Sequence, residues 1–164
     1  MKFSSQLVRC TFQGPLGPMT LAAHNAALVG VWFDGQQHQP AFEAWPISDA
    51  HPLLAVACTQ LGEYFGGKRE TFDLPLDASG GTQFQQQVWT ALQEIAPGTT
   101  ESYGTLSQRI GRPKAVRAVG AAIGRNPLSI VIPCHRVVGG NGALTGYAGG
   151  LERKIALLQL EGRF

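Results

Sequence analysis

A cysteine followed directly by a histidine and an arginine is the arrangement in this 164-residue chain that could perform covalent chemistry. Cys134, His135 and Arg136 come shortly after two prolines, which restrict the backbone and stiffen the path into the thiol. A thiol reacts as its thiolate, and His135, Arg136 and Lys154 are the candidates in this half of the chain to generate or stabilise one. The alternative is a buried cysteine with a packing role, the commoner use of this residue type.

The adjacency of Cys134 and His135 limits how the two could cooperate. Residues 126–138 are rich in β-branched side chains and predict a strand that runs into the cysteine. Neighbours in a strand face opposite sides, so a direct thiolate–imidazolium pair is not expected, and a water or a turn must intervene. Glu161 could orient the imidazole if the last helix folds back over the site; otherwise it is only a charge at a helix end.

Apolar residues at helical spacing predict four helices in the second half of the chain. Thr82 is the expected N-cap of the first helix, Pro97-Gly98 its stop, and Pro113 the first-turn residue of the third. The helices are expected over residues 84–95, 103–110, 114–123 and 151–161. Because a short glycine turn separates the second from the third, this part of the chain has the pattern of a helix-turn-helix.

The third of these helices combines basic with small residues. Lys114, Arg117 and, just past the end, Arg125 add positive charge, while Ala115 and three further alanines would let the helix approach another surface closely. Residues 84–164 hold nine Lys/Arg and four Asp/Glu, a net charge of +5, whereas residues 1–83 hold four and seven, a net charge of −3. A basic half favours an anionic partner such as nucleic acid. Helix–helix packing and a solvated basic face are the alternatives.

The first half of the chain predicts a small mixed unit. Apolar or alternating runs at residues 7–13, 19–23 and 27–33 predict an antiparallel meander, and residues 53–65 predict a helix that ends at Gly66-Gly67. Small turn-forming residues at 77–82 interrupt the pattern. We therefore expect an α/β or α+β domain at residues 1–80 and a second domain at residues 81–164.

Composition and residue spacing indicate the cellular compartment and whether a metal or cofactor is expected. A mean hydropathy of −0.01 is typical of a globular chain, no apolar stretch has the length of a membrane helix, and the first residues lack a signal-peptide core. We expect a cytoplasmic protein with reduced thiols. Metal-ligand residue types occur in the first half at Cys10, His24, His38, His51 and Cys58. Their spacing matches no compact zinc motif, so we expect no metal and no other cofactor.

The segment Pro133-Cys134-His135-Arg136-Val137 resembles the active-site signature of the methylated-DNA–protein-cysteine S-methyltransferases, the O6-alkylguanine-DNA alkyltransferases. The resemblance extends over residues 84–162 and includes 112–120, Asn126-Pro127 and 146–150. It implies an RNase H-like α/β domain followed by a winged helix-turn-helix-like DNA-binding and catalytic domain. The implied activity is single-turnover repair of double-stranded DNA. The alkyl group of a flipped-out O6-alkylguanine moves irreversibly to Cys134, and O4-alkylthymine is a further candidate substrate.

The resemblance also assigns catalytic roles to individual residues. It implies that His135 acts on the thiol through a water and that Glu161 orients it. Asn126 is implied to brace the active-site loop and Lys154 to line it. The implied catalytic set is Cys134, His135, Glu161, Asn126, Tyr103 and Lys154.

DNA contacts are implied for the helix at residues 114–123, which the family docks in the minor groove, where readout is nearly sequence-blind. Arg117 would take the place of the flipped guanine, and Tyr103 would contact the phosphate or the rotating base. Further DNA contacts are implied for Lys114, Ala115 and Arg125, and base-pocket positions for Val137, Tyr147 and Ala148. Ala148 stands where many members have Ser, so a hydroxyl contact to the lesion is missing.

Three other functions compete with this one. A helix-turn-helix module would bind DNA without chemistry, and a lesion sensor would flip bases but is expected to lack the acceptor cysteine. A cysteine hydrolase built on Cys134, His135 and Glu161 would need an oxyanion hole and a releasable thioester, and it would turn over repeatedly. For the repair protein we expect a monomer in solution that could bind DNA cooperatively.

Overall fold

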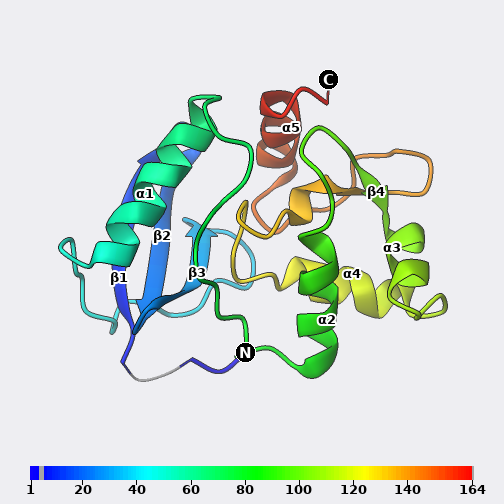
Figure 1. Ribbon diagram of the computed structural model, residues 1–164. Coiled ribbons are helices and arrows are strands. Elements are labelled where there is room, and N and C mark those ends of the chain that lie inside the picture. Colours follow the sequence, from blue (N-terminus) through cyan, green and yellow to red (C-terminus); the bar gives the residue numbers. More distant parts are fainter. Residues whose placement is uncertain (4–5, 164) are drawn as a thin grey trace.

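The first half of the chain is an antiparallel sheet with one long helix packed on it. The computed structural model describes residues 1–3 and 6–163. The sheet has the order β1-β2-β3, with a helix, α1, against one face (Figure 1). The bounds are β1 Val8–Gly14, β2 Gly17–His24, β3 Ala27–Phe33 and α1 Pro52–Phe65. The predicted meander and the predicted helix are confirmed.

Helix α1 begins and ends where its sequence predicts. Pro52 stands in the first turn, where a missing N–H costs nothing, and the chain leaves the helix through Gly66 and Gly67, the latter at φ 72°. Apolar residues of α1, together with Gln60, are buried, and the helix contacts all three strands of the sheet. Tyr64, in the last turn, is one of these buried residues.

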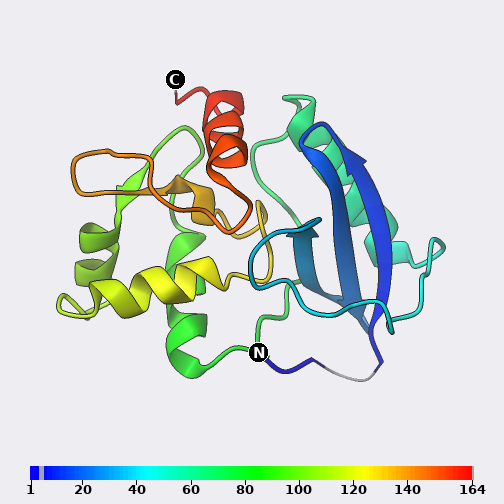
Figure 2. The ribbon, with the colours of Figure 1, turned by 180° about the vertical axis from the view of Figure 1, so that it is seen from behind.

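The second half is mostly helical. Its helices are α2 Gln83–Leu92, α3 Tyr103–Arg109, α4 Val116–Gly124 and α5 Leu151–Leu160. A parallel pair, β4 Glu101–Ser102 and β5 Val137–Val138, and a 3₁₀ turn, η1 Cys134–Arg136, complete it (Figure 2). Thr82 caps α2 in a reciprocal capping box with Gln85, which confirms the predicted N-cap.

Two helix bounds differ from the expectation. Helix α2 ends at Leu92 rather than running on to Pro97-Gly98, because residues 93–95 form tight turns in which each N–H bonds to the carbonyl three positions back. Helix α4 begins at Val116, so Pro113 and Lys114 belong to the preceding turn, which the bond from Ala115 N to Arg112 O closes. Lys114 and Ala115 are therefore before the helix rather than on it.

The predicted strand that leads into Cys134 was wrong. Residues 127–133 instead form a compact loop in which Val131 N bonds to Ser129 O and Ile132 N bonds to Leu128 O. Ile130 adopts φ 71°, a left-handed conformation that is costly for a β-branched residue. The β-branched composition indicated a strand, but hydrogen bonds within the loop and to β3 override that local preference.

The two halves share one hydrophobic core. Val31 N in β3 donates to Pro127 O at 2.8 Å, and Ser129 N donates back to Val31 O at 3.0 Å, so the loop before Cys134 is attached to the sheet. Figure 1 and Figure 2 both show α5 between the sheet side and the helical side of the molecule. Among the described residues, no helix has the length and apolarity that crossing a membrane requires.

Candidate active site

Cys134 begins η1 and is held by the side chain of Asn126. Its Sγ lies 3.0 Å from Asn126 Nδ2, which also donates to Ile132 O at 2.8 Å. Asn126 Oδ1 accepts from Leu128 N at 2.9 Å. One amide therefore binds both arms of the loop and the thiol together.

Cys134 is only 4% exposed, and its surroundings shift the pKa of its thiol in opposite directions. Burial raises its pKa, and this effect exceeds the opposing ones from the Asn126 amide, the Lys154 charge and the Tyr147 hydroxyl. The thiol is therefore protonated at neutral pH. It needs a base at the moment of reaction and groups that hold the thiolate once it forms.

His135 has the properties of such a base. Its side chain is fully buried, its Nε2 lies 2.8 Å from Glu161 Oε1, and its Nδ1 has no hydrogen-bond partner among the described residues. Burial lowers the pKa of His135 and outweighs the opposing effect of Glu161. The neutral imidazole with its proton on Nε2 donates to Glu161 and leaves Nδ1 as a proton acceptor.

Glu161 follows the last residue of α5 and accepts hydrogen bonds from two other parts of the chain, η1 and α1. Arg136 Nη2 donates to Oε1 at 2.8 Å and Arg136 Nε to Oε2 at 3.0 Å, a two-pronged contact, and Tyr64 Oη donates to Oε1 at 2.8 Å. Although burial opposes ionisation, the hydrogen bonds from His135 and Arg136 hold the pKa of Glu161 at about 2. Arg136 was a candidate cation to stabilise the thiolate, but it binds the carboxylate of Glu161 instead.

Lys154 is a fully buried cation that binds backbone carbonyls. Its Nζ donates to Val137 O at 2.5 Å, Thr145 O at 2.8 Å and Gly146 O at 3.4 Å. Burial lowers its pKa to about 8, against the effect of Cys134. Lys154 therefore ties β5 to the loop at 145–146 and places a positive charge near the sulfur.

A cavity of about 390 Å³ opens beside Cys134. Tyr103, Tyr147, Ala148 and Arg125 line it, whereas Val137 does not and packs in the core. The remaining lining residues come from α4 and two loops: Gln37, His38, Gly120, Ala121, Ile123, Gly124 and Gly146. The small residues of α4 leave room at one wall, and the ring of Tyr103 lies 3.9 Å from where a side chain at Gly120 would begin.

The other predicted DNA-contacting residues lie outside this cavity. Arg117 is exposed on α4, Lys114 is exposed and Ala115 half-buried in the turn before it, and the opposite face of α4 packs Val119 and Ala122 into the protein. Positive charge and small side chains thus share the exposed face of a helix whose edge borders the cavity with Cys134.

Three residues that complete this arrangement are not identifiable from local sequence. Tyr64 contacts Glu161, and Ser129 Oγ donates to Gln36 Oε1 at 3.1 Å, a buried contact between the loop and the first half. Each bond joins residues more than ninety positions apart. Pattern and spacing carry no signal for such pairs.

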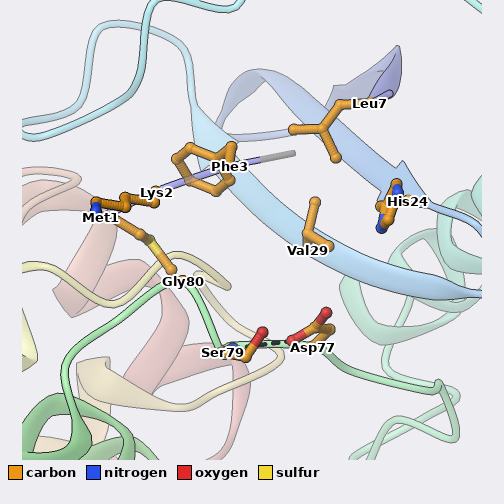
Figure 3. Close-up of a pocket in the computed structure, with 9 residues that line it drawn as sticks. All are labelled: Met1, Lys2, Phe3, Leu7, His24, Val29, Asp77, Ser79 and Gly80. Carbon is orange, nitrogen blue, oxygen red and sulfur yellow. Dashed lines mark hydrogen bonds between the residues drawn. The ribbon is translucent and has the colours of Figure 1, made fainter. Parts of the chain in front are cut away.

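The metal-ligand residue types of the first half are dispersed. Cys10 and Cys58 place their Sγ atoms 3.7 Å apart, and His38 lines the Cys134 cavity. His24 lines a different cavity, between the N-terminal residues, the sheet and the Asp77–Ser79 turn (Figure 3). No three His, Cys, Asp or Glu side chains among the described residues form a group that could hold a metal ion.

Comparison with known proteins identifies the family. Residues 83–163 match the family model for the DNA-binding domain of 6-O-methylguanine DNA methyltransferase, and residues 7–78 match the model for its ribonuclease-like domain. The chain belongs to the 6-O-methylguanine DNA methyltransferase family. These matches confirm the family, and they confirm the expected ribonuclease-like domain followed by a DNA-binding domain.

Several relatives in this methyltransferase family cover nearly the whole chain. The methylated-DNA–protein-cysteine methyltransferase of Mycobacterium tuberculosis is 46% identical over 92% of this chain and 90% of its own length. The protein of the same name from Methanosarcina acetivorans is 46% identical over 92% of this chain and 96% of its own length. The crystal structure of Mycobacterium tuberculosis OGT in complex with DNA superimposes with a TM-score of 0.89 at 45% identity, over 94% of this chain and 93% of that one.

Proposed function

We propose that this methyltransferase repairs double-stranded DNA by moving the alkyl group of an O6-alkylguanine to Cys134, once per molecule. The observation that carries the proposal is the buried thiol of Cys134 at the wall of a cavity. The next residue in the chain, His135, has a neutral imidazole that Glu161 holds in one tautomer. The names of its relatives state the same class of reaction, and one relative has been crystallised with DNA.

The side chains of the site suggest the chemical steps. Nδ1 of His135 accepts the thiol proton through a bridging water, while the Asn126 amide and the Lys154 charge stabilise the thiolate. The sulfur attacks the alkyl carbon, the bond from that carbon to O6 breaks, and its electron pair stays on the guanine, which takes up one proton. The products are unmodified guanine and a thioether. Because a thioether offers no bond that water readily cleaves, the protein is spent after one turnover.

Access to the buried thiol requires the damaged base to leave the duplex. Extrusion costs a few kcal/mol, less for a base pair that alkylation has weakened. Arg117 would fill the gap in the stack and hydrogen-bond the unpaired cytosine, and Tyr103 would guide the base into the cavity. The residues of the reaction come from one chain, so a monomer suffices. A reducing compartment such as the cytoplasm would keep the acceptor free.

The decisive experiment is the mass of the protein after incubation with a duplex that contains one O6-methylguanine. We expect a single methyl group on the peptide that holds Cys134, with saturation at one per protein. Cys134→Ser should gain no methyl group, and Cys58→Ser is the matched control that should react like the natural protein. Tight binding of the lesion without a mass change would indicate a sensor. Repeated release of product from an unmodified protein would indicate a hydrolase.

A further inference from the structure

The last turn of α1 brings a tyrosine of the ribonuclease-like half to the carboxylate of the catalytic half. Tyr64 is 2% exposed, its ring contacts those of Phe65 and Phe72 at centroid distances of 5.5 Å, and its hydroxyl donates to Glu161 Oε1 at 2.8 Å. This packing fixes the position of the hydroxyl, because the ring cannot turn away without opening the core.

Glu161 Oε1 is the oxygen at which three donors converge. His135 Nε2, Arg136 Nη2 and Tyr64 Oη each lie 2.8 Å from it, whereas the other oxygen, Oε2, receives Arg136 Nε. Arg136 sets the plane of the carboxylate through its two contacts. The hydroxyl of Tyr64 therefore binds the same oxygen, Glu161 Oε1, that binds the imidazole of His135.

We infer that Tyr64 is a positioning residue for alkyl transfer, whose hydroxyl sets the direction and the strength with which Glu161 holds His135. This inference rests on the proposed function of His135 as the base. A donor at Oε1 draws negative charge toward itself, so it weakens the attraction between that oxygen and a protonated imidazole. Tyr64 therefore helps to keep His135 neutral and ready to accept the thiol proton.

The alternative role for Tyr64 is packing alone, and the surroundings of the hydroxyl argue against it. A phenylalanine would fill the same space, yet the hydroxyl is buried and bonded to an ionised group. Burial and the charge of Glu161 raise the pKa of Tyr64, so the hydroxyl remains a donor throughout the working pH range. The ribonuclease-like half thus contributes one donor to the site of the other half.

The test is Tyr64→Phe in the full chain, with two independent readouts. The pKa of His135, followed by ¹⁵N NMR of its ring, should rise by on the order of one pH unit, because Glu161 then attracts the imidazolium more strongly. Alkyl transfer from free O6-methylguanine base should slow by up to about tenfold at pH values below the pKa of His135, and less near pH 7, because the acid limb of the pH profile moves to higher pH. The concentration of base that gives the half-maximal rate should stay the same.

Gln60→Leu is the matched control, because Gln60 lies on the same helix and its side chain bonds to the backbone of Asp73, within the first half. It should lower the melting temperature without moving the pKa of His135. If Tyr64→Phe melts cooperatively and leaves both the pKa of His135 and the pH profile unchanged, the inference is wrong. The NMR readout needs no alkyl transfer, so a failure of the proposed function would be distinguishable from a failure of this inference.

Discussion

The side-chain amide of Asn126 lies 3.0 Å from the sulfur of Cys134 and 2.8 Å from the carbonyl oxygen of Ile132. The same group therefore holds the loop together and favours negative charge on the sulfur of Cys134. Stability and reactivity of this site are coupled through one residue, which makes both measurable in one variant.

Asn126→Ala should impair both properties. Loss of the donor raises the pKa of the Cys134 thiol further, and the transfer rate to free O6-methylguanine base should fall on the order of a hundredfold. The buried N–H of Leu128 loses its acceptor and the carbonyl of Ile132 loses one of its two donors, so the free energy of unfolding should fall by about 1–3 kcal/mol, measured by urea denaturation. Asn141→Ala, in an exposed turn, should change neither quantity appreciably. A normal rate in a destabilised Asn126→Ala protein would contradict the electrostatic role.

Lys154 predicts a specific dependence of stability on pH. Its pKa is about 8 in the folded protein and near 10.5 when unfolded, so the unfolded chain binds more protons between these values and stability rises with pH there. The advantage of the natural protein over Lys154→Met in free energy of unfolding should therefore grow by about 2 kcal/mol from about pH 8 to about pH 10. Denaturant titrations of both proteins across this range measure it. A constant difference would mean that Lys154 titrates normally.

Arg117 should matter for duplex DNA alone. Arg117→Ala should slow repair of a duplex that contains O6-methylguanine, since only the duplex needs the extruded base held out, and leave the reaction with the free base unchanged. His135→Ala should slow both reactions. Lys68→Ala, which removes an exposed charge from the first half, controls for net charge. Equal losses for Arg117→Ala on the two substrates would contradict the assigned role.

Methylation of Cys134 should destabilise the protein. Cys134 is 4% exposed and its sulfur accepts a hydrogen bond from Asn126, so an added methyl group overfills the site and weakens that bond. We expect a loss of about 1–3 kcal/mol and a lower melting temperature for the methylated protein, measured by calorimetry beside the unreacted protein. Identical melting temperatures would show that the loop accommodates the methyl group without strain.

Local sequence was sufficient to predict the strands, the helices and the N-cap of α2, because these depend on residues close together in the chain. Apolar spacing predicted the strands of the meander and the helices, and Thr82 was correctly predicted as the N-cap of α2. Where local preference and long-range bonding disagreed, the expectation failed. The β-branched residues before Cys134 indicated a strand, yet bonds to Val31 and within the loop produced a turn.

The sequence by itself determined the family and indicated Cys134 as the candidate nucleophile, because the motif at 133–137 and the helix pattern are contiguous in the chain. Only the tertiary structure decided that Arg136 binds Glu161 rather than the thiol, and that Tyr64 reaches the same carboxylate from the other half. Such contacts depend on how the fold places the C-terminal ends of α1 and α5 relative to each other. Residue types and spacing do not encode that packing in any local pattern, so the complete hydrogen-bond network of the site emerges only in the folded chain.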